Sequence, residues 1–230
     1  MAGTVLLLHG SGPGTTGAAW ASLAEALAPD HRVIAPDLPG FGTEPKGSGP
    51  LGWAGWATAL VDEFGPCAVV GNSAGGALAL HLAYARAVTR VVAVGSMGAP
   101  LEIPPALDAL WASDDAREVL ELIFPGPVSD EAVAVRHRAM DAQPHYRELF
   151  PAPRQRWVDA LALTEQELGA IEVPVLLIHG SEDRIVPLEH GLALLRALPD
   201  ARMHIFGGCG HATALERTDE FNDLVRNFLT

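Results

Sequence analysis

The sequence predicts an α/β fold with a mostly parallel, doubly wound sheet of about six strands, because short apolar runs alternate with helical patterns. Six runs rich in β-branched residues recur along the chain. The runs are largely apolar, and continuous apolarity predicts strands that are buried on both faces of a parallel sheet. The runs occupy residues 4–8, 32–35, 68–70, 91–94, 175–178 and 203–206.

The helical patterns place apolar residues three or four positions apart. The clearest begins at Trp53 and ends at Phe64, between the second and third runs. Related patterns cover residues 20–27, 188–195 and 221–228. One apolar face on each helix predicts packing against the sheet, with Trp53 and Trp56 in the core.

One region breaks the alternation. Residues 100–169 contain no strand pattern, only short helical patterns separated by prolines. A segment of this length between two core strands is too long for a passive loop, so we interpret it as a helical cap over a binding site. A subdomain used only for packing or dimerisation is the alternative. The expected organisation is a core formed by residues 1–99 and 170–230, interrupted by a cap insertion at 100–169.

Composition excludes several classes of partner. With 28 acidic and 15 basic residues, the chain has a net charge of -13, the wrong sign for general binding to nucleic acid or anionic lipid. The start of the chain has the pattern of a strand and not of a signal peptide. The two cysteines lie in no disulfide framework or metal spacing. We expect a cytoplasmic protein with a small-molecule substrate and without a metal, organic cofactor, nucleic-acid partner or membrane association.

The third run leads into the pentapeptide Gly71-Asn72-Ser73-Ala74-Gly75, which a small-residue helical pattern follows. This is the G-x-S-x-G nucleophile elbow in its strand–turn–helix setting. The tight turn holds the serine in strained geometry, and small neighbours let strand and helix approach closely. Ser73 is therefore the candidate nucleophile.

A serine nucleophile needs a base, and the base needs a carboxylate that fixes its tautomer. His211 follows the last run in a glycine-rich turn, which would deliver an imidazole to the sheet edge. Asp183 follows the fifth run and is the candidate acid, with its neighbour Glu182 as the alternative. Each of the other histidines has a structural explanation in a strand end, a helix or a surface.

Negative charge that develops on a carbonyl oxygen needs preorganised N–H donors. The backbone N–H of Ala74, directly after the nucleophile, is the first candidate. The second is the N–H of Ser11 or Gly12, in the glycine-rich loop after the first run. A phosphate-binding loop is the competing interpretation, but the phosphate-binding sequence patterns are not present.

These motifs resemble the α/β-hydrolase superfamily and, more narrowly, its meta-cleavage product hydrolases, which cut a carbon–carbon bond in ring-fission products of aromatic catabolism. The resemblance runs almost from end to end. It rests on residues 9–14, 71–76, 150–161, 179–188 and 209–211. It implies an α/β-hydrolase fold with a helical cap and a triad of Ser73, Asp183 and His211.

The resemblance also implies substrate-binding residues. Asn72 lies beside the nucleophile, and an arginine of the cap would grip the substrate carboxylate through a planar, charge-assisted fork. Arg138 is the nearest match for that arginine. Arg136 is the other candidate, because the alignment of this segment with the family's motif does not fix the register. Trp157 in the cap motif and Ala212 complete the expected set.

Three positions depart from the family pattern. Ala212 stands where tryptophan usually follows the catalytic histidine. Trp20 stands where the family often has asparagine, and Ala74 replaces a common methionine. All three changes touch the substrate chamber and none touches the triad, so the chemistry is better defined than the specificity.

The family's leading hairpin is expected to be missing, because only eight residues precede His9. Residues 32–35 would then form the edge of the sheet. An apolar edge strand invites pairing or cover, which predicts a homodimer through that edge.

Three functions stay open at this point. The first is cleavage of 2-hydroxy-6-oxo-dienoates, by attack on a carbonyl of the 1,5-diketone that ketonisation of the dienol forms. The second is a carboxylesterase or thioesterase of relaxed specificity with the same triad. The third is a small-molecule-binding protein in which the triad is idle.

Overall fold

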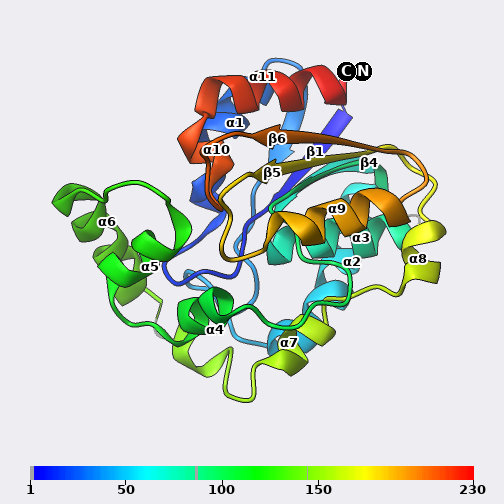
Figure 1. Cartoon of the computed structure of the whole chain (residues 1–230). Helices are drawn as coiled ribbons and strands as arrows, with labels where there is room; N and C mark the ends of the chain where they lie inside the picture. The colour runs from blue at the N-terminus through cyan, green and yellow to red at the C-terminus, as the bar shows by residue number, and fades with distance from the viewer. Residues whose placement is uncertain (1–2, 86–87, 144) are drawn as a thin grey trace.

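Six parallel strands form a single sheet in the computed structural model, which describes residues 3–85, 88–143 and 145–230 (Figure 1). The strand order is β2-β1-β3-β4-β5-β6. The strands are β1 (Gly3–Leu8), β2 (His31–Ile34), β3 (Cys67–Asn72), β4 (Val88–Val94), β5 (Val175–Gly180) and β6 (Ala201–Phe206). Each strand contains or overlaps one predicted run, so the prediction of a six-stranded, parallel α/β sheet is confirmed.

Helices cover both faces of the sheet. One face packs against α1 (Ala21–Leu27) and α11 (Thr218–Leu229), and the other against α2 (Trp53–Phe64), α3 (Ala74–Tyr84) and α9 (Leu188–Ala197) (Figure 1). Neighbouring strand residues point to opposite faces: Leu6 packs on the side of α2, α3 and α9, and Leu7 packs on the side of α1 and α11. Burial on both faces explains the apolar runs of the inner strands. The edge strands β2 and β6 differ from the expectation: they are partly exposed and carry Arg32, Arg202 and His204, because each has only one neighbouring strand.

The chain between β4 and β5 is helical, and we call residues 100–169 the cap segment. Its described residues contain no strand. They form α4 (Pro105–Ala112), α5 (Ala116–Ile123), α6 (Asp130–Asp141), the short 3-10 helix η3 (Tyr146–Glu148), α7 (Gln155–Asp159) and α8 (Glu165–Gly169). Figure 1 shows α4 to α7 along one side of the sheet, beyond the ends of its strands. The helix α6 has no buried residue, so it lies on the outside of the cap segment.

Three short elements complete the fold: η1 (Gly17–Trp20), η2 (Gly49–Gly52) and α10 (Thr213–Glu216). The strand β2 lies at one edge of the sheet, and pairing of a second copy there stays a prediction. Among the residues described, no helix is both long and apolar enough to span a bilayer.

The order of the strands also determines where a site forms. The sheet runs outward in both directions from the neighbouring strands β1 and β3, so the connections that follow these two strands diverge to opposite faces. In parallel sheets, ligands bind outside the carboxyl ends of strands at such a point. Ser73 follows β3 and the glycine-rich loop follows β1, so both are placed there.

Candidate active site

Ser73 occupies a tight turn between β3 and α3. Among the non-glycine residues that the structure describes, only Ser73 has a positive φ, at 55°. Its N–H donates to Val94 O over 2.8 Å, which holds the turn against β4. A Cβ on Gly71 would collide with the carbonyl of Gly75. The strand and the helix therefore meet closely enough to keep the serine in its strained conformation.

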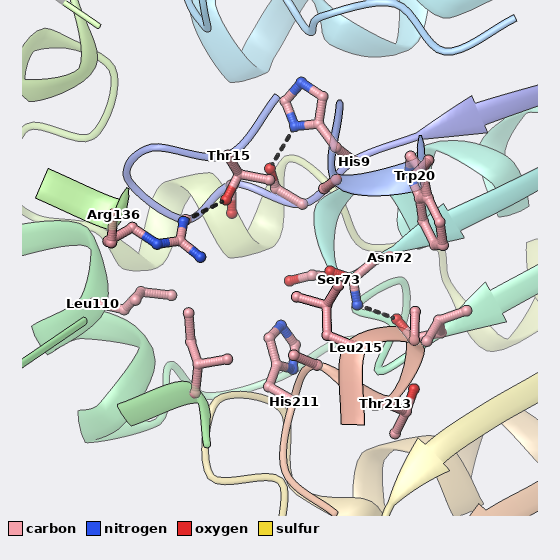
Figure 2. A pocket seen from close by; sticks show the side chains of 18 residues that line it. His9, Thr15, Trp20, Asn72, Ser73, Leu110, Arg136, His211, Thr213 and Leu215 are labelled. Atoms are coloured by element: carbon pink, nitrogen blue, oxygen red, sulfur yellow. Dashed lines mark hydrogen bonds between the residues drawn. The ribbon is translucent and has the colours of Figure 1, made fainter. Parts of the chain in front are cut away.

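His211 and Asp183 form a buried pair beside this turn. His211 Nδ1 lies 2.7 Å from Asp183 Oδ2, and the N–H groups of Ile185 and Val186 both donate to Asp183 Oδ1 over 2.9 Å. With its Nδ1–H directed to the carboxylate, the neutral ring has its Nε2 lone pair available. Figure 2 shows the Ser73 side chain beside the His211 ring in one pocket. This arrangement can activate a hydroxyl group.

Glu182, the alternative acid, is exposed, whereas the Asp183 side chain is fully buried. The reason is the turn after β5: the Glu182 N–H donates to Cys209 O, and the next side chain turns inward. Of the two neighbouring carboxylates, only that of Asp183 contacts the imidazole of His211.

The loop that carries His211 is clamped through its backbone. Both carboxylate oxygens of Glu216 accept from the Gly210 N–H, at 3.0 and 3.1 Å. The N–H of His211 itself donates to Ile123 O, at the end of α5, over 2.9 Å. Burial raises the pKa of Glu216, and the backbone N–H groups oppose that rise. Sequence reasoning missed Glu216; its spacing of five residues after the histidine was the available signal.

A second histidine supports the acid. His179 Nε2 lies 2.8 Å from Val186 O, so it donates there, and it is 3.5 Å from Asp183 Oδ2. Burial lowers the pKa of His179, and the nearby Asp183 partly offsets this effect. The sequence had assigned His179 only to the end of a strand.

The predicted oxyanion donors lie on two sides of Ser73. Ala74 is the first residue of α3, and the first N–H groups of a helix have no partner within the helix. Ser11 and Gly12 line the pocket that contains Ser73. They belong to the β1 loop, by which we mean residues 9–16. His9 anchors this loop: its Nδ1 donates to Gly10 O over 2.8 Å.

His9 is neutral at physiological pH. Its Nε2 accepts the Leu38 N–H over 2.9 Å while Nδ1 donates, which requires the uncharged tautomer. Burial lowers the pKa of His9 to about 4, against the opposing effects of Gly10 and Asp37. This histidine is therefore a structural residue of the β1 loop and no base at neutral pH.

A pocket lies above Ser73. It holds about 680 Å³ of empty space, which includes open solvent at its mouth. Its walls include residues 9–12, 72–73 and 211–215, with Leu110, Ile123 and Arg136 from the cap segment. Figure 2 shows Arg136 and Trp20 on opposite sides of Ser73. Most other wall residues are small or apolar, so a charged ligand group has one clear partner, Arg136.

The structure brings some of the expected substrate residues to this pocket. Asn72 and Ala212 line it, and Asn72 is oriented by donating to Val94 O over 3.1 Å. Arg136 also lines it and donates to Pro13 O over 2.9 Å.

Arg138 and Trp157 lie elsewhere. Arg138 is exposed on α6. Residues two positions apart on a helix point about 200° apart, so a helix that directs Arg136 into the pocket directs Arg138 away from it. Trp157 is buried, and its indole N–H donates to Pro151 O over 3.0 Å, within the cap segment and outside the pocket wall. The sequence pattern could not settle either point, because both depend on how the cap helices are oriented.

No group of His, Cys, Asp and Glu side chains in the described part of the chain is arranged to hold a metal ion. Cys209 is buried next to the His211 loop.

Comparison with known proteins places this chain in a family. Residues 5–224 match the alpha/beta hydrolase family. The chain belongs to that family. It is 38% identical, over 98% of its length and 88% of the relative's, to 2-hydroxy-6-oxo-2,4-heptadienoate hydrolase of Pseudomonas putida. It is also 38% identical to 2-hydroxymuconate semialdehyde hydrolase of Pseudomonas sp. strain CF600, over 98% of this chain and 86% of that one.

Solved structures agree with this assignment. A variant of the meta-cleavage product hydrolase CumD from Pseudomonas fluorescens IP01 superposes with a TM-score of 0.92 at 36% identity, covering 98% of this chain and 90% of that one. The 2-hydroxy-6-oxo-6-phenylhexa-2,4-dienoate hydrolase from Rhodococcus sp. strain RHA1 gives 0.85 at 29% identity, covering 98% and 90%. This alpha/beta hydrolase is therefore an enzyme of the hydrolase class, and the expected α/β-hydrolase fold is confirmed.

Proposed function

We propose that this hydrolase cleaves a carbon–carbon bond in 2-hydroxy-6-oxo-dienoate products of aromatic ring cleavage, with Ser73, His211 and Asp183 as its triad. The observation that supports the substrate class is Arg136. Its guanidinium lines the same pocket as Ser73 and His211, and its hydrogen-bond partners, Pro13 O and Thr15 Oγ1, are neutral. A cation in a pocket with no charged partner favours an anionic ligand, and each dienoate has a carboxylate.

In the proposed reaction, the Ser73 hydroxyl attacks the substrate and His211 Nε2 takes its proton. Asp183 holds the imidazole ring of His211 and stabilises the imidazolium that forms. Attack occurs at the carbonyl of the ketonised substrate. The backbone N–H of Ala74 and an N–H of the β1 loop, from Ser11 or Gly12, stabilise the developing oxyanion. The carbon–carbon bond then breaks, and its electron pair leaves as a dienolate that takes the proton from the His211 imidazolium and becomes the 2-hydroxydienoate. The acyl group stays on Ser73 Oγ until one water hydrolyses it and releases the carboxylic acid.

A carboxylesterase or thioesterase is the second candidate. The wall around Ala212 and Ala214 is small and apolar, and Leu215 at the mouth is 55% exposed. A neutral acyl group would fit this part of the pocket without using the arginine. Cytoplasmic location and a homodimer through β2 stay predictions.

The first experiment follows the visible absorbance of a 2-hydroxy-6-oxohexa-2,4-dienoate with the protein, beside the hydrolysis of a neutral p-nitrophenyl ester. The Ser73→Ala variant is measured in parallel. Rapid loss of dienoate absorbance that depends on Ser73 and exceeds ester hydrolysis is the expected result. Ester hydrolysis without dienoate loss would favour the esterase, and no turnover of either would favour a binding role.

A further inference from the structure

The cap segment contacts the β1 loop through a series of hydrogen bonds. Gln143 makes two of them: its Oε1 accepts the Gly14 N–H over 2.8 Å, and its Nε2 donates to Thr15 O over 2.7 Å. Two further cap side chains reach Ser11. The Trp111 indole N–H donates to Ser11 Oγ, and the Tyr146 hydroxyl donates to Ser11 O, both over 3.0 Å.

We infer that the cap segment positions the oxyanion hole, with Gln143 and Tyr146 as positioning residues that orient the N–H groups of the β1 loop. This inference rests on the proposed function, because it assigns the second oxyanion donor to Ser11 or Gly12.

Tyr146 acts through the peptide group between Ser11 and Gly12. In a trans peptide the C=O and the N–H point in opposite directions within one plane. A hydroxyl that holds Ser11 O therefore also sets the direction of the Gly12 N–H. His9 sets the preceding peptide group in the same way, through its bond to Gly10 O. The core thus orients the Ser11 N–H and the cap orients the Gly12 N–H.

The Tyr146 hydroxyl is suited to this task because it stays protonated. Burial raises the pKa of Tyr146 well above its usual range, and the nearby Arg154 and Arg136 only partly oppose this. The group therefore remains an O–H donor over the whole pH range in which a histidine base works.

Gln143 acts through the turn that follows. The Thr15 N–H donates to Gly12 O over 3.1 Å, which closes a turn from Gly12 to Thr15. Gln143 bonds to the last two residues of this turn: its Oε1 accepts from the Gly14 N–H and its Nε2 donates to Thr15 O. The amide thus pairs with the backbone as a neighbouring β-strand would. Gln143 as a residue is 4% exposed, so water does not compete readily for these bonds. Loss of Gln143 would release the turn that positions Gly12.

The chain offers a matched control. Gln155 also lies in the cap segment and also bridges backbone groups: its Oε1 accepts the Ile103 N–H and its Nε2 donates to Leu101 O, both over 2.8 Å. This bridge supports residues 101–103 and not the β1 loop. Gln143→Leu and Gln155→Leu therefore remove the same kind of bond pair from different places.

The test measures the rate at which a fluorophosphonate labels Ser73, because its phosphoryl oxygen must enter the oxyanion hole, together with kcat and KM for a p-nitrophenyl ester. For Gln143→Leu we expect the labelling rate and kcat to fall by about 10- to 100-fold, and KM to stay within about twofold. This loss is no larger than the roughly 100- to 1000-fold fall in kcat that follows removal of one oxyanion-hole donor, because the variant misplaces the Gly12 N–H and does not delete it. For Gln155→Leu we expect both rates within about twofold of the unsubstituted chain.

Tyr146→Phe is the second variant, with Tyr84→Phe as its control, since Tyr84 is 41% exposed and lies outside the pocket wall. Tyr146→Phe deletes one hydroxyl group. If Gln143→Leu does not fold, the comparison of Tyr146→Phe with Tyr84→Phe tests the inference by itself. Rates in the Gln143 and Tyr146 variants equal to those of their controls would overturn the inference and leave the proposed function standing. No labelling of Ser73 in the unsubstituted chain would instead overturn the proposed function, and the inference with it.

Discussion

Replacing Arg136 with methionine would remove the cation from the pocket and keep most of the side chain's length. Arg136 is half-buried, and this burial lowers its pKa by removing part of the water around its charge. Its bonds to Pro13 O and Thr15 Oγ1, at 2.9 and 3.4 Å, leave other N–H groups of the guanidinium for a ligand. A substrate carboxylate would gain charge-assisted bonds at this place.

The expected loss follows from that pairing. Removing one partner of a hydrogen-bonded, partly buried charge pair costs about 2 to 4 kcal/mol, or roughly a 30- to 1000-fold loss in kcat/KM. Arg136→Met should show this loss with a dienoate. The variant also loses the hydrogen bond to Pro13 O. Because this bond lies within the protein, its loss should lower kcat/KM for every substrate to the same extent. A neutral p-nitrophenyl ester measures that shared part, and we expect it to be less than about tenfold.

Arg138→Met is the matched control, since it removes the same charge from an exposed position two residues further along α6. We expect its kcat/KM for both substrates within about twofold of the unsubstituted chain. Equal losses for dienoate and ester in Arg136→Met would refute recognition of the carboxylate by Arg136. A selective loss in Arg138→Met would show that the other arginine is the carboxylate ligand.

Three further predictions concern the acid, the His211 loop and the pH dependence of folding. Asp183→Asn should lower kcat at pH 7 by about 10³- to 10⁴-fold, because the amide favours the wrong tautomer of the base; loss of dienoate absorbance measures it, and a loss below tenfold would contradict the assignment. Glu216→Gln should lower kcat about tenfold with little change in KM, since one amide oxygen replaces two carboxylate oxygens, and the exposed Asp219→Asn should change neither. The free energy of unfolding should fall as the pH drops from about 6.5 to 4. Burial lowers the pKa of His9 and of His190 from 6.5 to about 4, so the unfolded chain binds more protons than the folded chain in this pH range. Each histidine contributes up to about 3 kcal/mol of this loss, to be measured by urea unfolding at pH 7 and 4.5, and His190→Leu should flatten part of the slope.

The parts of the fold that the sequence predicts well are those that neighbouring residues determine. The inner strands are built on short apolar runs, and the elbow at Ser73 depends on residues within three positions of it. At these strands and at this turn, the residues nearby in the sequence largely determine the backbone conformation.

The parts that the sequence leaves open depend on distant contacts. Gln143 and Gly14 are 129 residues apart, and no pattern near either residue indicates that they pair. The choice between Arg136 and Arg138 depends on the rotation of α6, which contacts the rest of the chain only through half-buried residues and has no buried one. Trp157 has the size and burial of a substrate residue, but its neighbours lie within the cap segment.

The contacts between core and cap imply that catalysis and specificity are not separable in this enzyme. The His211 N–H is held by Ile123 O, and Arg184, next to the proposed acid, donates to Glu121 O and Phe124 O at the same end of α5. The base loop is thus tied to the cap segment on one side of Ser73, as the β1 loop is on the other. A substitution that moves α5 should therefore lower kcat even where it touches no substrate. In a lid that only covers the pocket, the same substitution would change KM instead.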